Sequence, residues 1–271
     1  MKKLIRNKEI RKLALLITIF MTAIFMVFFS IFAVIGNFSK NRKQEKLNEQ
    51  IVEIYDLKFQ LTKMNNQIAL YEAEVEKMEF ITQLKNELRI ILLDRDRFNV
   101  ERIDEDHLCF MEAQRAQYEI PKHIYYRLIF AESGFKMFDN DGNVLRSNGG
   151  AMGYMQMLGS TFNWINSRYD LNLSDVGNPY DNIIAGTFYL NKRRENIDAM
   201  FPNASEEHKW RLTIASYNAG LEDVRKARGV PTIRYHDSSR FSFGDPNTET
   251  MAYVNFITRN FMSDDQLLAM L

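Results

Sequence analysis

The chain has 271 residues, in which 35 lysines and arginines balance 35 aspartates and glutamates. This length allows one domain of ordinary size with accessory segments. The neutral balance argues against a strongly basic nucleic-acid binder, and no nucleic-acid partner is expected. The single cysteine, Cys109, excludes an internal disulfide bond. The four histidines lack metal-ligand spacing, so we expect chemistry without a metal or other cofactor.

Residues 13–35 form an uncharged, almost wholly apolar run. As a helix this run would extend about 35 Å, which is enough to cross a hydrocarbon core of about 30 Å. A cleaved signal peptide is the alternative, but its apolar region would be shorter, at about 7–15 residues, and would end in a small-residue cleavage site. Residues 36–40 make a poor cleavage site, so the sequence predicts a retained single-pass transmembrane anchor.

Basic residues are more numerous before this run, within residues 1–12, than after it, within residues 40–46. The positive-inside rule then favours a cytoplasmic N-terminus over residues 1–12, with the rest of the chain on the extracytoplasmic side.

A heptad pattern follows within residues 40–98. Positions 47, 54, 61, 68 and 75 are apolar, and so are positions 57, 64, 71 and 78. Such spacing predicts a helical stalk of the coiled-coil type, through which the chain could form a homo-oligomer. A helix folded back on its own domain is the alternative. Ile81, Leu84, Leu88 and Ile91 fall one residue early, which indicates either a local change in supercoil or docking against the next domain.

Residues 104–271 are predicted to form one mainly helical domain. The apolar periodicity favours helices at 120–132, 160–168, 181–200, 205–219 and 248–261, and residues 229–245 look like a loop. The fold class predicted for the chain is therefore mainly α.

Glu132 is the first residue that points to chemistry, because it ends an otherwise apolar and aromatic run. Pro121 suits the first turn of a helix, and Ser133-Gly134 suits its end, so Glu132 would lie in the last turn. The helix dipole and the apolar neighbours there both favour the neutral carboxyl group, which is the form that a general acid needs. A surface glutamate at a frayed helix end is the alternative.

Five short blocks occur in one order along the chain: 131–135 (AESGF), 150–156 (GAMGYMQ), 181–190 (DNIIAGTFYL), 215–220 (ASYNAG) and 249–254 (ETMAYV). In type, order and rough spacing they resemble the blocks of the lytic transglycosylase family with the lysozyme-like SLT domain. The resemblance covers about residues 115–258.

This resemblance implies a mainly helical, lysozyme-like fold with a cleft that binds the glycan strand of peptidoglycan. Taken with the predicted anchor at 13–35, it leads us to expect an enzyme of the bacterial inner (plasma) membrane whose catalytic domain lies on the extracytoplasmic side. Glu132 matches the family's acid/base, which would cleave the MurNAc–GlcNAc bond and leave a 1,6-anhydro-MurNAc end. By the same resemblance, six residues are expected to bind the substrate: Ser147, Gly150, Met155, Gln156, Tyr217 and Asn218. Glu249 is expected to brace the cleft.

Two departures from the family pattern leave alternatives open. The proline after the glutamine block is missing, and the loop between Glu132 and Gly150 is longer than usual. Asp139 or Asp141 in that loop could supply a second carboxylate, as a hydrolytic muramidase of similar fold would need. A third alternative is a wall-penetrating assembly component of a conjugation, secretion or phage machine, which the anchor and stalk suggest.

Overall fold

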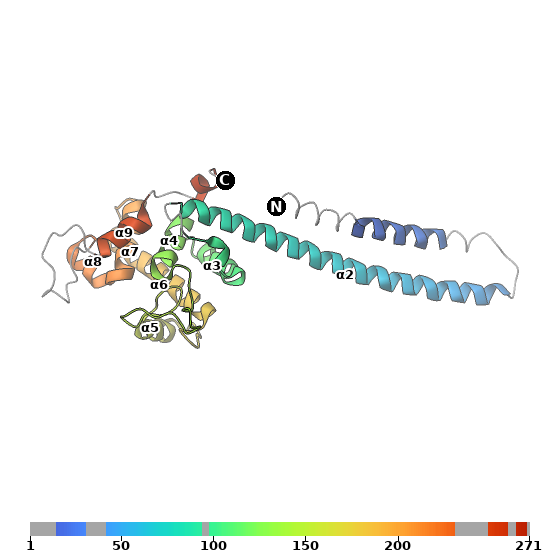
Figure 1. Ribbon diagram of the computed structural model, residues 1–271, viewed down its shortest axis with the longest axis horizontal. Helices are drawn as coiled ribbons and strands as arrows, with labels where there is room; N and C mark the ends of the chain where they lie inside the picture. Colours follow the sequence, from blue (N-terminus) through green and yellow to red (C-terminus); the bar gives the residue numbers. More distant parts are fainter. Residues whose placement is uncertain (1–14, 31–41, 94–97, 231–248, 260–263, 270–271) are drawn as a thin grey trace. The chain divides into compact units, whose positions relative to one another are not determined.

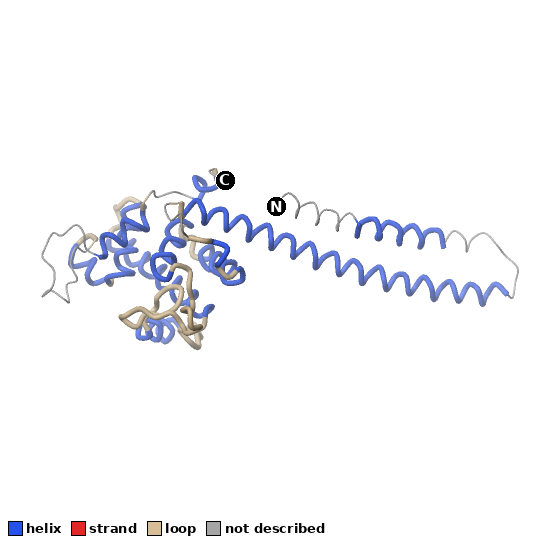
Figure 2. Tube along the Cα trace, viewed as in Figure 1, coloured by secondary structure: helices blue, strands red, loops and turns tan. Residues whose placement is uncertain are grey.

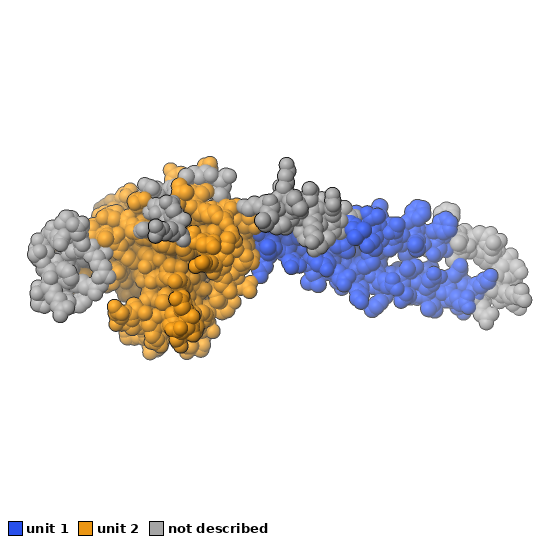
Figure 3. Space-filling model, in the orientation of Figure 1, with its two compact units in different colours: residues 1–80 blue, residues 81–271 orange. Residues whose placement is uncertain are grey.

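The computed structural model describes residues 15–30, 42–93, 98–230, 249–259 and 264–269 (Figure 1). By its internal contacts the chain divides into two compact units, residues 1–80 and residues 81–271 (Figure 3). The described residues are mainly helical, as predicted, and isolated bridges are the only strand-like pairing among them.

Two helical segments make up the described residues of the first unit. Residues 15–30 are helical, and large apolar side chains along them are exposed, among them Phe25 at 71% and Phe29 at 71%. Within the described residues, no helix combines the length and the apolar character needed to cross a membrane. Residues 13–14 and 31–35, at the two ends of the predicted anchor, lie outside the described residues.

The second helical segment of the first unit belongs to α2 (Arg42–Ile91). Its heptad positions from 47 to 68 are half-buried, whereas Tyr71, Val75 and Met78 are exposed. A long continuous helix is therefore present over most of the predicted stalk region, residues 40–98. The coiled coil stays a prediction. A coiled coil requires a second helix packed along the apolar heptad positions.

The last turns of α2 belong to the second unit. Four apolar side chains there are at most 2% exposed and belong to the buried core of the second unit: Ile81, Leu84, Leu88 and Ile91. Docking, one of the two explanations for the shifted heptad register, therefore accounts for these four residues. The division between the units falls after residue 80, earlier than the boundary at 98–104 that the sequence suggested.

The second unit is a helical domain whose helices are joined by loops (Figure 2). After the 3₁₀ turn η1 (Val100–Arg102), its helices are α3 (Glu105–Gln117), α4 (Lys122–Ser133), α5 (Gly159–Tyr169), α6 (Pro179–Met200), α7 (Glu206–Ala219), α8 (Leu221–Ala227), α9 (Glu249–Thr258) and α10 (Asp264–Leu268). The five helices predicted in this region are confirmed over the described residues with small shifts at their ends, while α3, α8 and α10 were not predicted. Most of the predicted loop at 229–245 lies outside the described residues.

Helix α4 is the most deeply buried of these helices. Tyr125, Tyr126, Leu128 and Ile129 are fully buried, and α9 packs against α4. Helix α7 in turn packs against α6, α8 and α9. An apolar helix surrounded by others supplies a rigid support for any side chain at its end.

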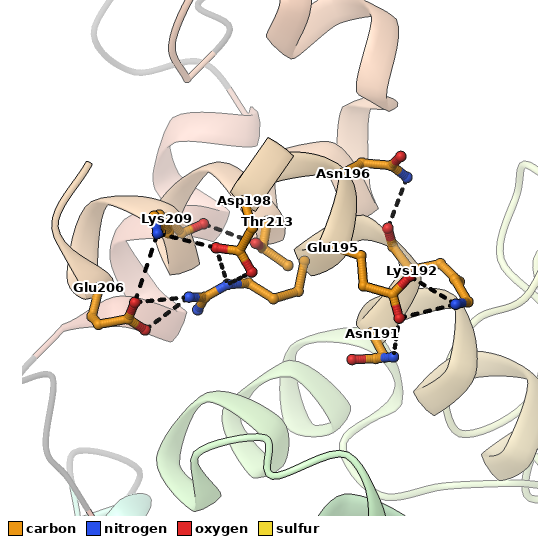
Figure 4. Close-up of polar contacts among 9 residues, drawn as sticks. Asn191, Lys192, Glu195, Asn196, Asp198, Glu206, Lys209 and Thr213 are labelled. Atoms are coloured by element: carbon orange, nitrogen blue, oxygen red, sulfur yellow. Dashed lines mark hydrogen bonds and ion pairs between the residues drawn. The ribbon is translucent and has the colours of Figure 1, made fainter. Parts of the chain in front are cut away.

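Charged side chains join α6 to α7 away from α4. Asp198, Glu206 and Lys209 gather at this junction (Figure 4), where Lys209 lies 3.3 Å from Asp198. Arg194 donates to Asp198 at 3.0 Å and to Glu206 at 2.8 Å. Part of this network is exposed, so each pair contributes little stability.

Candidate functional site

Glu132 lies in the last turn of α4, as the sequence predicted. Pro121 precedes the first turn, and Gly134 ends the helix in the left-handed conformation at φ 60°, with its N–H donating to the Phe130 carbonyl at 2.9 Å. Glycine adopts this conformation without the steric cost that a Cβ atom brings. The helix therefore ends immediately beyond Glu132.

The environment of Glu132 is apolar enough to change its ionisation. Phe98 packs edge-on against Phe130 and stacks on Phe135, so aromatic rings surround the end of α4. Burial raises the pKa of the Glu132 carboxyl group to about 7, and the hydrogen bond from Tyr253 opposes this rise. Desolvation is thus the larger cause, as expected for a carboxyl group among apolar neighbours.

Tyr253 on α9 donates a hydrogen bond from its hydroxyl group to the Glu132 carboxyl group. Burial and the nearby Glu132 charge raise the pKa of Tyr253 well above its usual value, so the phenol stays a donor. The sequence analysis assigned no role to Tyr253, although this residue lies within the 249–254 block. Its partner is a residue far away in the chain, which no local pattern reveals.

A pocket of about 310 Å³ brings together several residues that the sequence singled out. Its lining residues come from α5, α6, α7 and the loops beside them: Gln156, Met157, Leu158, Thr161, Tyr189, Tyr217, Asn218, Ala219 and Gly220. Three of the predicted site residues, Gln156, Tyr217 and Asn218, therefore share one cavity. Such a hollow with hydroxyl and amide groups in its wall suits a sugar ring.

Each of these three polar side chains is held by a hydrogen bond. The Tyr217 hydroxyl donates to the Met155 carbonyl at 2.7 Å, and the Gln156 amide donates to the Gly153 carbonyl at 2.9 Å. Thr250 of α9 donates to the Asn218 amide oxygen at 2.9 Å. Glu132 does not line the pocket, but its charge is among the causes that raise the pKa of Tyr217, after burial.

The loop at residues 147–157 is shaped by its backbone. The Ala151 N–H donates to the Ser147 hydroxyl at 3.1 Å, and the Gly150 N–H donates to the Ser147 carbonyl at 3.0 Å. Gly150 has φ 81°, a conformation that favours glycine. Ser147 and Gly150 thus form an exposed turn, and the Ser147 hydroxyl group stabilises that turn.

Substrate contact by Met155 stays a prediction. Its side chain is fully buried, and a Cβ atom at Gly186 on α6 would lie only 2.3 Å from the Met155 Cβ atom. Packing between this loop and α6 therefore decides the position of Met155. Its carbonyl, which accepts from Tyr217, is its link to the pocket.

Asn182 on α6 binds the same loop through hydrogen bonds to its backbone. This buried amide accepts from the Met155 N–H at 3.0 Å and donates to the Met152 carbonyl at 2.9 Å and the Val176 carbonyl at 3.0 Å. Gly153 has φ 72° and packs directly on the Asn182 side chain. The 181–190 block thus supports the 150–156 block, a relationship that the sequence order alone does not reveal.

Asp139 and Asp141 lie in the exposed part of the long loop. One Asp139 oxygen accepts from the backbone N–H groups of Asp141 and Asn143, both at 2.9 Å. Asp139 therefore stabilises its own turn, as aspartate commonly does. Glu249 begins α9, and its side chain lies outside the described part of the structure.

Residues 109–234 match the family model described as the transglycosylase SLT domain. This region is a transglycosylase SLT domain. The match includes α4 with Glu132, the loop at 147–157 and the pocket residues of α6 and α7.

An SLT domain at 109–234 supports a glycan-cleaving activity of the transglycosylase or lysozyme-like type, with peptidoglycan as the substrate. Tyr253 lies beyond the matched residues, yet it bonds the glutamate within them. The folded domain that contains Glu132 therefore extends beyond the matched region.

Proposed function

We propose that the chain is a peptidoglycan lytic transglycosylase that cleaves the MurNAc–GlcNAc bond and leaves a 1,6-anhydro-MurNAc end. One observation carries the proposal. Within an SLT domain, Glu132 has a carboxyl group whose pKa is about 7 and whose position is set by Tyr253. A carboxyl group with that pKa can both give and take a proton near neutral pH.

The proposed reaction needs no water. Protonated Glu132 gives its proton to the oxygen that joins MurNAc C1 to GlcNAc, the C1–O bond breaks, and GlcNAc leaves with a hydroxyl group. The MurNAc 6-hydroxyl oxygen then bonds to C1, and its proton passes to the Glu132 carboxylate. The substrate's own N-acetyl group stabilises the positive charge at C1 between these steps, as in other substrate-assisted glycosidases.

This mechanism requires one carboxylate, and the structure offers Glu132 for it. The rival hydrolytic muramidase requires a second carboxylate to activate water. Asp139, the nearest candidate by sequence, is exposed and accepts from two N–H groups of its own loop. These contacts favour the single-carboxylate mechanism.

The pocket supports the proposed binding of the sugar chain. Gln156, Tyr217 and Asn218 would meet hydroxyl and acetamido groups in this pocket. The turn at Ser147 and Gly150 would let backbone approach the sugar closely. Met155 would act through its carbonyl, which orients Tyr217.

We further propose that residues 13–35 anchor the chain in the bacterial inner membrane, with the SLT domain on the extracytoplasmic side. The proposal rests on the uncharged run of the sequence and on the exposed apolar side chains of the helix at 15–30. The exposed heptad residues Tyr71, Val75 and Met78 would pair stalks in a homo-oligomer.

The reaction is tested by digesting purified sacculi with the full chain, kept in mild detergent, and analysing the soluble muropeptides by mass spectrometry. We expect 1,6-anhydro-MurNAc ends, which lack the water present in a reducing end. Glu132→Gln should release none of them. Glu195→Gln, a substitution in an exposed ion pair on α6, serves as the matched control and should digest like the wild type.

Products with reducing ends alone would overturn the transglycosylase assignment in favour of a muramidase. Sacculi that are bound but not cut would instead indicate an assembly or glycan-binding component. Equal digestion by the wild type and by Glu132→Gln would remove Glu132 from the chemistry.

A further inference from the structure

Arg127 connects three helices at the centre of the second unit. It belongs to α4, the helix that carries Glu132, and it is only 4% exposed. Its Nε donates to the Ile91 carbonyl at 3.0 Å, and one terminal nitrogen donates to the Phe256 carbonyl at 2.9 Å. Its guanidinium group also lies over the Phe256 ring, at 5.6 Å from the ring centre.

Both acceptors lie at the ends of helices. Ile91 is the last residue of α2, and Phe256 lies in the last turn of α9. Carbonyl groups there have no donor within their own helix, and the C-terminal end of a helix attracts positive charge. A buried guanidinium group with several fixed donors can therefore bind two such ends at once.

Helix α9 also carries Tyr253, one turn before Phe256. Tyr253 donates to Glu132, and Phe256 accepts from Arg127, so α9 meets α4 through two hydrogen bonds. On its other side, α9 is tied to α7, where Arg211 donates to Thr258 at 2.9 Å and to Asn255 at 2.8 Å. The contacts with α7 hold α9 in the domain, whereas those with α4 set its register against Glu132.

The two acceptors of Arg127 lie on either side of the matched SLT region. Ile91 precedes residues 109–234 and Phe256 follows them. The end of α2 is fixed in turn, because Leu88 and Ile91 are fully buried in the domain core. Arg127 thus joins a firmly packed segment before the matched region to a segment after it.

We propose that Arg127 is a positioning residue for the reaction: by binding the end of α9 and the end of α2, it sets the contact between Tyr253 and Glu132. The inference rests on the proposed catalytic role of Glu132. It extends that role to a residue that touches neither the sugar nor the carboxyl group.

The test compares the wild type, Arg127→Lys, Tyr253→Phe and the double variant in the full chain. Lysine keeps the charge but offers one amino group in place of the planar fork, so one of the two carbonyls should lose its donor. We expect kcat for muropeptide release to fall about tenfold, with a smaller change in KM because the pocket residues are unchanged.

The second measurement does not depend on activity. The Glu132 carboxyl group is titrated by NMR with ¹³C-labelled glutamate, and its signal is the one that Glu132→Gln removes. Arg127→Lys and Tyr253→Phe should both raise this pKa, by about half to one unit, because each weakens the hydrogen bond to the carboxylate. The double variant should show the shift of Tyr253→Phe and no further increase.

Arg194→Lys is the matched control, because Arg194 also joins helices through fixed donors, which it directs to Asp198 of α6 and Glu206 of α7. It should leave the Glu132 titration unchanged. If Arg127→Lys destabilises the protein too far, Arg127→Gln tests the same contacts with a neutral donor.

An unchanged Glu132 titration in folded Arg127→Lys, or shifts that add in the double variant, would overturn the positioning role. These results differ from a failure of the proposed function. In that case the wild type itself would release no 1,6-anhydro products, while the titrations would still report on the contact.

Discussion

Tyr253 of α9 donates a hydrogen bond to Glu132 of α4, although 121 positions separate the two residues in the chain. Both groups are partly buried, and burial raises the pKa of the Glu132 carboxyl group. The tyrosine therefore opposes the effect of burial and limits how strongly the carboxyl group retains its proton. It also fixes the orientation of the carboxyl group at the end of α4.

Removing this hydroxyl group should move the pH dependence of the reaction. In Tyr253→Phe the carboxylate loses a donor, so the pKa of Glu132 rises and the loss of kcat/KM at high pH should begin at a higher pH. We also expect kcat to fall about tenfold, because the carboxyl group is less well oriented. The measurement is a pH–rate profile of muropeptide release. A Tyr253→Phe profile that coincides with the wild type would show that the contact has no part in catalysis.

The wild type itself should lose activity as the pH rises through about 7, since the first step needs the protonated form of Glu132 and that is its pKa. Initial rates with soluble glycan fragments between pH 5 and pH 9, at limiting substrate, measure this limb. Activity that stays constant across this range would exclude Glu132 as the proton donor.

Replacing Glu132 by glutamine should stabilise the fold at high pH. The pKa is about 7 in the folded protein and near 4.5 in the unfolded chain, so the wild type loses stability as the pH rises through this window. Above pH 7, Glu132→Gln should exceed the wild type by on the order of 3 kcal/mol, and the difference should disappear near pH 4. Urea unfolding at pH 4 and pH 8 measures it, with exposed Glu195→Gln as the control. If the two proteins differed by the same free energy of unfolding at both pH values, burial of the Glu132 charge could not be the cause.

Gly186→Ala should destabilise the domain. An added Cβ atom would lie 2.3 Å from the Cβ atom of Met155, so the loop at 147–157 must move away from α6. Alanine favours a helix by about 1 kcal/mol, but overpacking costs about 1–3 kcal/mol, and we expect a net loss together with reduced activity.

Gly159→Ala is the comparison for this substitution, because a Cβ atom there meets only the end of Met152, at 3.9 Å. In urea unfolding, Gly159→Ala should leave the free energy of unfolding unchanged. Equal stability of the two variants would show that Met155 and its loop adjust at no cost.

Much of the fold could be predicted because its signals are local. The apolar run ending at Glu132, the Ser133-Gly134 stop and the periodicity of α6 and α7 each depend on neighbouring residues. The shifted heptad register at Ile81 left two explanations open, and only the contacts of the folded chain show that the second unit begins there. Met155 could equally be a core residue by its type alone, and its burial depends on Gly186, which lies on another helix.

Four features could be derived from the amino-acid sequence: the helical class, the end of α4, the candidate acid and the resemblance to the SLT family. These follow from spacing, side-chain chemistry and the order of short blocks along the chain. The contacts between distant residues became visible in the folded chain: Tyr253 with Glu132, Asn182 with the loop at 147–157, and Arg127 with the ends of α2 and α9. Burial and contact depend on segments that are distant in the chain, and no local pattern specifies which of them will meet.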